Sequence, residues 1–443
     1  MRYMAESRGT NKMANHLIVV SVDALVYEDL ELLGKQPNVK RLLENGSLVR
    51  HMRTVYPSLT HIVHTTLMTG CTPDKTGIIA NEHFEPGNAR PSWYNALDEV
   101  QCETLFHAAK KKGLRTCSCR WPLTAGGFDV IDYLVPEIMD EDREGAADLL
   151  EVHRKMCSPE IYEDIILPNI GILDWSKSKH PTDEEFQITC ACDIIRKYKP
   201  NLVLTHPSFV DDTRHRYGLF SDKLNEALIA TDRWIGMLLD AVRDAGIEDD
   251  TNIAIVSDHG HLEEVRSIAF NVFLKEKGYI DTDEQGKVTD WRAYAKGCGL
   301  SAEIYVSEAG DKEAVYQDLC SMARAGIYGI SEVLTAEEAE ARYGICGAFS
   351  FIVETDGYSD FCDEWLGEAV IPAERAAFRY GHSDHGHMPE KGPQPPMIVC
   401  GPDFKQGEQL DNGKVVDEAP TFARVLGLDL PEAQGQVMEA LLR

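Results

Sequence analysis

Three short groups of aspartate and histidine residues in this sequence have the composition of metal sites. They are Asp211, Asp212 and His215 in FVDDTRHRYG, Asp258 and His259 after the apolar run IAIVS, and Asp384 and His385 before Gly386. An aspartate and a histidine four residues apart share one face of a helix, and carboxylate with imidazole is a common ligand set for zinc. An isolated Asp-His-Gly sequence is more often a turn than a ligand pair. Each group alone is therefore only a weak indication of metal binding.

Thr60 is a candidate nucleophile because of the position that the sequence predicts for it. It follows the turn-like stretch YPSL and precedes a helical pattern over residues 61–69 that ends at Gly70. The first turn of a helix has unpaired N–H groups and the positive end of the helix dipole, and both favour a bound anion. A threonine at this place is also a common N-cap. Position alone therefore leaves both roles open.

The apolar runs between these residues predict the elements that must hold them. Strands are predicted at 16–22, 48–55, 116–121, 201–205 and 252–256, and helices at 27–33, 39–43, 184–198 and 224–242. Such alternation indicates an α/β fold, a three-layer sandwich whose mainly parallel central sheet is flanked by helices. Asp23 follows the first predicted strand, and ligand crevices open at the carboxyl ends of parallel strands.

Residues 265–380 interrupt this alternation with short mixed elements near 302–306, 313–323 and 349–353. The run 397–400 then returns to the main sheet. We predict a catalytic core formed by residues 14–264 and 381–443, and an inserted cap subdomain formed by residues 265–380. We expect the cap to cover the metal cleft and to shape specificity.

The acidic composition excludes some classes of partner. Asp and Glu number 73 against 44 Lys and Arg in 443 residues, a formal charge of −29 that disfavours binding to nucleic acid polymers and anionic membranes. A small anionic substrate stays compatible with this charge, because bound divalent ions reverse the local sign of a site. No apolar run reaches the length of a membrane span, which leads us to expect a cytoplasmic protein. The twelve cysteines are expected to be reduced and mostly buried.

Taken in order along the chain, these residues resemble the pattern of the nucleotide pyrophosphatase/phosphodiesterase family of the alkaline phosphatase superfamily. The resemblance runs from SVDAL at residues 21–25 to DEAPTFARVLGLDLP at residues 417–431, and only residues 265–380 lack a clear signature. It implies a metal-dependent hydrolase of phosphodiester or pyrophosphate bonds in small anionic substrates.

The resemblance also implies a set of site residues. One zinc ion would be held by Asp23, Asp258, His259 and the oxygen of Thr60, and a second by Asp211, His215 and His385. Zinc coordination would lower the pKa of the threonine hydroxyl, which would attack phosphorus and form a phosphothreonine intermediate. Asn81 in GIIANEHF would donate to a non-bridging phosphate oxygen, and Trp121 would line the site. Manganese or iron suits ligands of the same types.

Two departures from the family pattern bear on this assignment. His206 stands five residues before Asp211, where family members that act on nucleotides carry a tyrosine that stacks on the base. A histidine can also stack, but the expected preference for nucleotides is weaker. His261 and His387 stand beside predicted ligands, and we expect them to support those ligands or to lie at the surface, not to bind a third metal.

Two other functions stay open at this point. A carbon–phosphorus hydrolase that resembles phosphonoacetate hydrolase would share the metal ligands and the threonine, although the sequence shows no lysine pair for a carboxylate. A non-catalytic zinc-binding protein on the same fold is a further alternative. The presence of Thr60 among the predicted ligands argues against it, because a binding module needs no nucleophile.

Overall fold

The computed structural model describes residues 14–443, except 89, 140–141, 143–147, 174–178, 309 and 374–381. Its largest element is an eight-stranded sheet with the strand order β19-β2-β18-β6-β1-β5-β3-β4. The strands are β1 His16–Ser21, β2 Ser47–Arg53, β3 Thr116–Cys119, β4 Tyr133–Val135, β5 Leu202–Thr205, β6 Thr251–Val256, β18 Met397–Cys400 and β19 Gln409–Lys414. All pair in parallel except β18, which is antiparallel to β6 and β2. The prediction of a mainly parallel sheet is confirmed.

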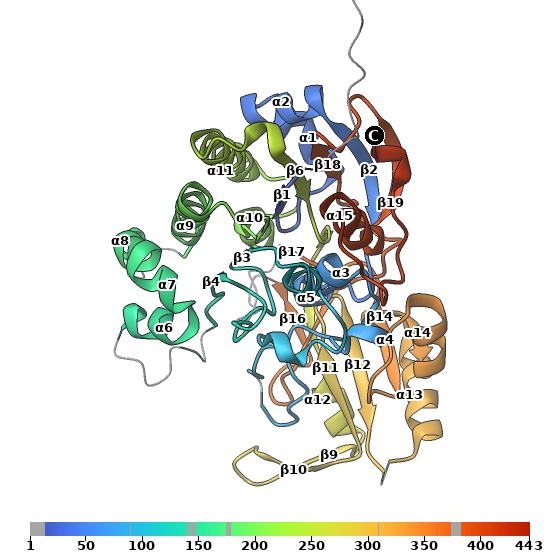
Figure 1. Ribbon diagram of the computed structural model, residues 1–443. Coiled ribbons are helices and arrows are strands. Elements are labelled where there is room, and N and C mark those ends of the chain that lie inside the picture. Colours follow the sequence, from blue (N-terminus) through green and yellow to red (C-terminus); the bar gives the residue numbers. More distant parts are fainter. Residues whose placement is uncertain are drawn as a thin grey trace, which may run out of the picture.

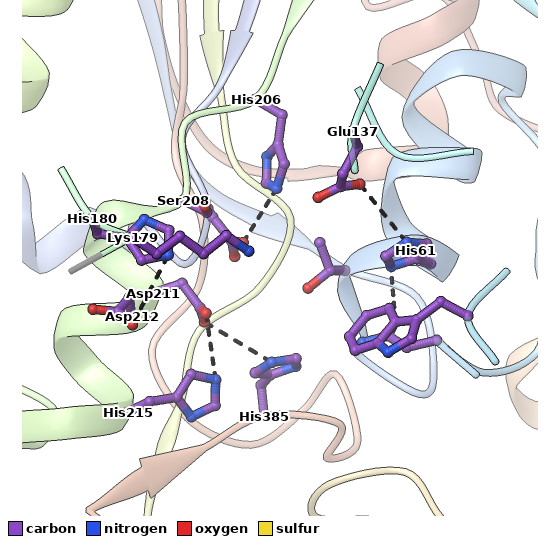
Figure 2. Close-up of a pocket in the computed structure, with 14 residues that line it drawn as sticks. His61, Glu137, Lys179, His180, His206, Ser208, Asp211, Asp212, His215 and His385 are labelled. Atoms are coloured by element: carbon purple, nitrogen blue, oxygen red, sulfur yellow. Dashed lines mark hydrogen bonds and ion pairs between the residues drawn. The ribbon is translucent and has the colours of Figure 1, made fainter. Parts of the chain in front are cut away.

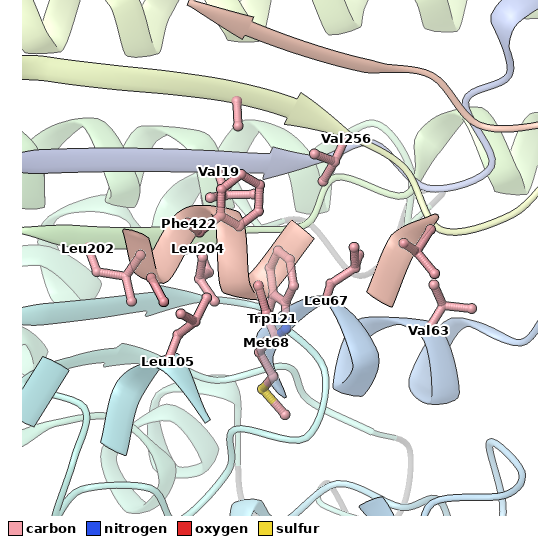
Figure 3. Close-up of a cluster of buried hydrophobic side chains, with 14 of the residues drawn as sticks. Val19, Val63, Leu67, Met68, Leu105, Trp121, Leu202, Leu204, Val256 and Phe422 are labelled. Carbon is pink, nitrogen blue, oxygen red and sulfur yellow. The ribbon is translucent and has the colours of Figure 1, made fainter. Parts of the chain in front are cut away.

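Helices cover both faces of this sheet (Figure 1). One face carries α1 Leu30–Leu33, α2 Pro37–Asn45, α9 Thr182–Tyr198, α10 Phe209–Tyr217 and α11 Leu224–Asp244, and the other carries α3 Thr60–Thr69, α5 Leu105–Lys111 and α15 Glu418–Leu426. Successive side chains of a strand point to opposite faces, so Leu17 and Val19 of β1 join one apolar cluster and Ile18 and Val20 join the other. Figure 3 shows Val19 in the first cluster with Phe422 of α15. The chain therefore forms the predicted three layers.

Short helices extend the fold beside β3 and β4 and next to α3. They are α4 Pro73–Thr76, α6 Leu149–Met156, α7 Pro159–Ile161 and α8 Leu167–Asn169. The predicted strand at 116–121 ends two residues early, because Arg120 has a positive φ of 56° and turns the chain out of the sheet. None of the helices in the described ranges has the length and apolar character that crossing a membrane requires.

The described residues between 265 and 380 form small sheets of their own below the main sheet in the view of Figure 1. The four-stranded antiparallel sheet has the order β11-β12-β14-β13, the three-stranded one β15-β8-β16 and the two-stranded one β10-β9. These strands are β8 Arg266–Ala269, β9 Ile280–Thr282, β10 Val288–Trp291, β11 Ala293–Gly297, β12 Ser301–Val306, β13 Ile330–Thr335, β14 Phe351–Thr355, β15 Ser359–Cys362 and β16 Val370–Pro372. The helices are α12 Phe270–Glu276, α13 Lys312–Ala325 and α14 Ala336–Tyr343.

The segment has its own apolar cluster, which includes Phe270, Leu319 and Val353. Its predicted end, between residues 380 and 381, lies outside the described residues. The division into a catalytic core and a cap stays a prediction. Two further short strands, β7 Leu262–Glu263 and β17 Ser383–Asp384, pair with each other at the start and end of the segment.

Candidate functional site

The carboxyl ends of three adjacent strands bring the predicted ligands together. Asp23 follows β1, His206 follows β5 and Asp258 follows β6, and these strands are neighbours in the sheet. The turn of the chain after β5 leads into α10, which carries Asp211 and His215 one helical turn apart. Parallel strands place their carboxyl ends at one edge of a sheet, so residues far apart in sequence share this edge.

Asp23, Asp258 and His259 form the first candidate metal group, with donor atoms that all lie within 4.8 Å of one another. The Nε2 atom of His259 is 3.1 Å from Asp258 Oδ2 and 3.6 Å from Asp23 Oδ1. All three side chains are buried, and Asp23 Oδ1 and Asp258 Oδ2 accept no hydrogen bond from the described residues. The Thr60 Oγ1 atom lies 3.2 Å from His259 Nε2, which places the predicted nucleophile at this group.

Asp211, His215, His261 and His385 form the second candidate group, again with donor atoms within 4.8 Å of one another. Asp211 Oδ2 lies 3.4 Å from His215 Nε2. Asp211 Oδ1 lies 2.7 Å from His261 Nε2 and 3.9 Å from His385 Nε2. The Nδ1 atoms of His215 and His385 lie 2.9 and 3.1 Å from backbone carbonyl oxygens. An N–H at Nδ1 can donate to such a carbonyl, which orients the ring and leaves the Nε2 lone pair for a metal ion.

His261 is a fourth candidate ligand that the sequence reasoning did not include. Its side chain is fully buried, which rules out the expected surface position, and it contacts Asp211 directly. The signal was present in the sequence DHGH, where His261 stands two residues after His259. His387, the other extra histidine, is also buried and lies near Ser58 and the Lys391 carbonyl, outside both groups.

The electrostatics of the two groups suit bound cations. Burial raises the pKa of Asp23 well above its usual range, and the Asp211 and Asp258 carboxylates raise it further. Burial also raises the pKa of Asp258 to about 7. Burial lowers the pKa of His259 well below its ordinary value and that of His261 to about 3. Neutral imidazoles and crowded carboxylates are the donor set that a divalent transition metal requires, so these residues fit such an ion.

Thr60 is the first residue of α3, and the N-cap position belongs to Leu59. Thr60 is therefore not the plain N-cap that the sequence left open. Its neighbour His61 donates its backbone N–H to Asn81 Oδ1 at 3.0 Å. Because the amide oxygen is occupied in this way, the Asn81 Nδ2 group is the end of the side chain that can donate to a ligand. Asn81 and Thr60 both line the same cavity.

The cavity has a volume of about 290 Å³ and opens above the two candidate metal groups. Figure 2 shows Lys179, His180 and Asp212 on one side of it, and Glu137 and His61 on the other. Burial lowers the pKa of His61 to about 3, so this ring is neutral beside Glu137. The other residues that line the cavity are Asp23, Trp93, His206, Ser208, Asp211, His215 and His385.

Several of these wall residues were missed by the sequence reasoning, because loops far apart in the sequence supply them. Trp93, Glu137 and Lys179 belong to no motif and lie outside the long helices and strands. His61, Asp212 and Ser208 had a signal in the sequence, because they stand within three residues of Thr60, Asp211 and His206.

Trp121 does not line the cavity, and the expectation that it would is corrected. Its side chain is fully buried in the apolar cluster under α3, where its indole N–H donates to the His64 carbonyl at 3.3 Å. His206 does line the cavity, but its Nε2 atom is 3.3 Å from Asp23 Oδ2 and its ring packs on His64. With 4% exposure, this ring offers little area for stacking on a base.

Residues 265–380 were expected to cover the metal cleft. This expectation is wrong for the cavity wall, because none of their described residues lines the cavity. They instead support the loop that carries His385. Leu300 N–H donates to the His385 carbonyl at 2.8 Å, and the Ser301 hydroxyl donates to the Gly386 carbonyl at 2.8 Å. Gly386 has a φ of 95°, and a Cβ atom there would lie 2.0 Å from the Cys298 carbonyl oxygen, so only glycine fits this contact.

Comparison with known proteins relates this site to one family. The family model described as type I phosphodiesterase / nucleotide pyrophosphatase matches residues 17–351. Human ectonucleotide pyrophosphatase/phosphodiesterase family member 1 is 28% identical over 240 residues, which cover 51% of this chain and 21% of that protein. Venom phosphodiesterase 2 of Crotalus adamanteus is 26% identical over 261 residues, which cover 56% of this chain and 27% of that protein. The chain thus matches about a quarter of the length of these relatives.

Among solved structures, murine ectonucleotide pyrophosphatase / phosphodiesterase 5, as an inactive variant in complex with AMP, matches with a TM-score of 0.65 and 18% sequence identity. The match covers 97% of this chain and all of that one. The human counterpart matches with a TM-score of 0.66 and 17% identity. These similarities establish the shared fold.

Proposed function

Because this chain belongs to the type I phosphodiesterase / nucleotide pyrophosphatase family, we propose that it is a metal-dependent hydrolase of phosphodiester or pyrophosphate bonds in small anionic substrates. The observation that carries this proposal is the position of Thr60 at the start of α3, with Oγ1 3.2 Å from His259 in a buried Asp-His group. The murine relative in complex with AMP supports a phosphoester of about nucleotide size. The cavity volume of about 290 Å³ is compatible with a ligand that is only partly enclosed.

The residues that would hold two metal ions follow from the two groups. Asp23, Asp258 and His259 would hold one ion, and Asp211, His215 and His385, with His261 as an additional candidate, would hold the other. When bound, two divalent ions neutralise the carboxylates, lower the pKa of the Thr60 hydroxyl and stabilise charge on phosphoryl oxygens. We propose zinc because both groups combine imidazole with carboxylate, and manganese or iron suits the same ligands.

Thr60 and Asn81 carry the proposed chemistry of the chain itself. The Thr60 oxygen attacks phosphorus, the bond from phosphorus to the leaving oxygen breaks, and the phosphoryl group remains on Thr60. Water then attacks the phosphothreonine, releases the phosphorylated product and restores the hydroxyl. The Asn81 Nδ2 group and the first N–H groups of α3 donate to non-bridging oxygens and stabilise the charge that develops on them.

Lys179 keeps a second function under consideration. Its side chain lies at the cavity rim beside His180, opposite Glu137 (Figure 2). An ammonium group there can pair with a second anionic group of the substrate, either another phosphate or the carboxylate of a phosphonate such as phosphonoacetate. A carbon–phosphorus hydrolase therefore stays the alternative function.

A location inside the cell stays a prediction, which fractionation of the native host can check.

The test compares Thr60→Ala and Thr60→Ser with the wild type on a chromogenic phosphodiester, a phosphomonoester and phosphonoacetate. Thr60→Ala should lose at least about a thousandfold in rate, or about 4 kcal/mol of transition-state stabilisation, while Thr60→Ser keeps measurable activity. Thr65→Ala is the matched control, because this hydroxyl lies on the same helix and donates to the His61 carbonyl at 2.7 Å. A folded, metal-loaded Thr60→Ala protein with the wild-type rate would exclude Thr60 as the nucleophile.

A further inference from the structure

The loop that carries Asn81 forms an irregular hairpin, whose described residues are 81–88 and 90–94. Its two arms are joined by hydrogen bonds from Tyr94 N–H to the Asn81 carbonyl at 3.0 Å and from His83 N–H to the Ser92 carbonyl at 2.8 Å. A bridge between Glu82 and Trp93 lies between these bonds. Asn81 and Trp93 both line the cavity, although the hairpin belongs to none of the larger sheets. Something outside the hairpin must therefore fix its position.

Lys296 on β11 reaches the base of this hairpin. Its Nζ atom lies 2.6 Å from Glu82 Oε2 and 3.0 Å from Asp363 Oδ2. The Lys296 and Glu82 side chains are only 3% and 9% exposed. Burial alone would lower the pKa of Lys296, but the Asp363 and Glu82 carboxylates raise it above its ordinary value. The ammonium group therefore stays charged between two carboxylates.

The outer part of the hairpin is held by the same segment. Phe84 stacks on Tyr305 of β12 with ring centroids 3.6 Å apart and an interplanar angle of 6°. The Gly87 N–H donates to the Tyr294 hydroxyl at 3.1 Å. Residues 265–380 thus hold the hairpin at its tip through aromatic contacts and at its base through a buried ion pair. Of these contacts, only the ion pair between Lys296 and Glu82 is next to Asn81, which lines the cavity.

We propose that Lys296 is a positioning residue for the proposed hydrolysis: by holding Glu82, it fixes Asn81 so that the Asn81 amide meets the phosphoryl group. A buried ion pair tolerates little displacement, because each charge is desolvated and depends on its partner. The Asn81 side chain is also held by the hydrogen bond from His61 N–H, next to Thr60. Lys296 therefore sets the distance between the nucleophile and the phosphate donor. Through it, a segment that does not line the cavity contributes to catalysis.

This inference rests on the proposed function, and a double-mutant cycle tests it. Lys296→Met should lower kcat on the best phosphoester substrate by about ten- to a hundredfold, since a displacement of about 1 Å at a catalytic group can have such an effect. In an Asn81→Ala background the same substitution should change kcat by less than about threefold. Lys296→Arg, which keeps the charge, should recover part of the rate. Equal losses in both backgrounds would overturn the proposal.

Two further measurements keep the test decisive. Arg266→Met is the matched control, because it breaks an ion pair with Asp356 at 2.7 Å in the same segment without contact to the hairpin, and it should leave kcat unchanged. If Lys296→Met does not fold, its combination with Glu82→Gln and Asp363→Asn removes all three charges of the cluster and should show the same loss.

Binding of inorganic phosphate gives a readout that is independent of turnover. Its affinity should fall about tenfold in both Lys296→Met and Asn81→Ala. A wild-type protein that binds phosphate but hydrolyses no phosphoester refutes the proposed function alone. Unchanged phosphate affinity in Lys296→Met, with a loss in Asn81→Ala, refutes the role of Lys296 alone.

Discussion

Two regions of this molecule bury several charged side chains, and they do so in opposite ways. At the cavity, Asp23 and Asp258 lie within 4.8 Å of each other through their donor atoms, and among the described residues no lysine or arginine pairs with either. At the base of the hairpin, Glu82 and Asp363 share the ammonium group of Lys296. The four carboxylate side chains are all largely buried, since none of them is more than 12% exposed.

The difference indicates what each region is built for. Buried carboxylates without a cationic side chain are unfavourable by themselves and become favourable when a cation binds, so the first region is adapted to a ligand. The second region supplies its own cation and holds two parts of the chain in register. Substitutions should therefore have opposite effects on stability and on metal content in the two regions.

The largest expected effect is that of Asp258→Asn. The variant removes a charged donor from the first group, so its metal content should fall by about one ion per chain and its kcat/KM by at least about a thousandfold. Elemental analysis and steady-state kinetics measure both quantities. Asp363→Asn is the matched control, because it neutralises a buried carboxylate next to Lys296 and should leave the metal content unchanged. Full metal content and activity in Asp258→Asn would contradict the assignment.

The second prediction concerns stability without metal. Lys296→Met leaves two buried carboxylates without their cation and should lower the free energy of unfolding by about 3 kcal/mol. Asp258→Asn removes a buried charge, while its amide oxygen can still accept from Ala24 N–H, as Asp258 does at 3.0 Å. It should therefore be at least as stable as the wild type. Urea unfolding in the presence of a chelator measures both, and the reverse order would show that the two regions do not differ as argued.

The sequence predicted the central sheet well, because its strands are continuous apolar runs buried on both faces. β1, β5 and β6 differ from their predicted ranges by one residue. β19, with the sequence QLDNGK, was not predicted, because this edge strand is largely exposed and has no apolar run. β4 has only three residues and gave too short a signal.

The residues of the site also fall into those that the sequence predicts and those that it does not. Asp23 and Asp258 could be found because they follow buried strands directly, and a parallel sheet brings such ends together. Glu137 and Lys179 could not, since only the folded chain brings their loops to the cavity. Lys296 reads as an ordinary strand residue until Glu82, 214 positions away, is placed beside it.

The third prediction is that metal binding stabilises the wild type. A ligand that binds only the folded state adds about 2.7 kcal/mol at a concentration one hundred times its Kd. Zinc titrated into metal-free protein should therefore raise the Tm, and a chelator should reverse the change. The increase should be smaller in Asp258→Asn, which keeps only the second group intact, and should persist in Lys296→Met. A Tm that does not respond to zinc, manganese or iron would argue against a metal site in the first region.

The smallest effect concerns Glu303, a buried carboxyl that pairs with Lys296 across neighbouring strands. Its pKa shows how strongly the charge of Lys296 acts on a third carboxyl. Burial raises the pKa of Glu303 from 4.5 to about 7, although the Tyr305 hydroxyl, which donates to it at 2.7 Å, and Lys296 lower the pKa in part. A carboxyl with a raised pKa binds its proton more tightly in the folded state. Its contribution to stability is present below about pH 4.5 and is lost as the pH rises through about 7.

Glu303→Gln should therefore remove a pH-dependent loss of stability. Between pH 5 and pH 7 the free energy of unfolding of the wild type should fall by about 2 kcal/mol more than that of the variant, since one pKa unit corresponds to about 1.4 kcal/mol. Urea unfolding of metal-free protein at both pH values measures the difference. Glu308→Gln, at an exposed position of the same segment, should follow the wild type. Identical pH dependence in Glu303→Gln and the wild type would mean that Lys296 keeps Glu303 ionised, and that its charge balances three carboxylates instead of two.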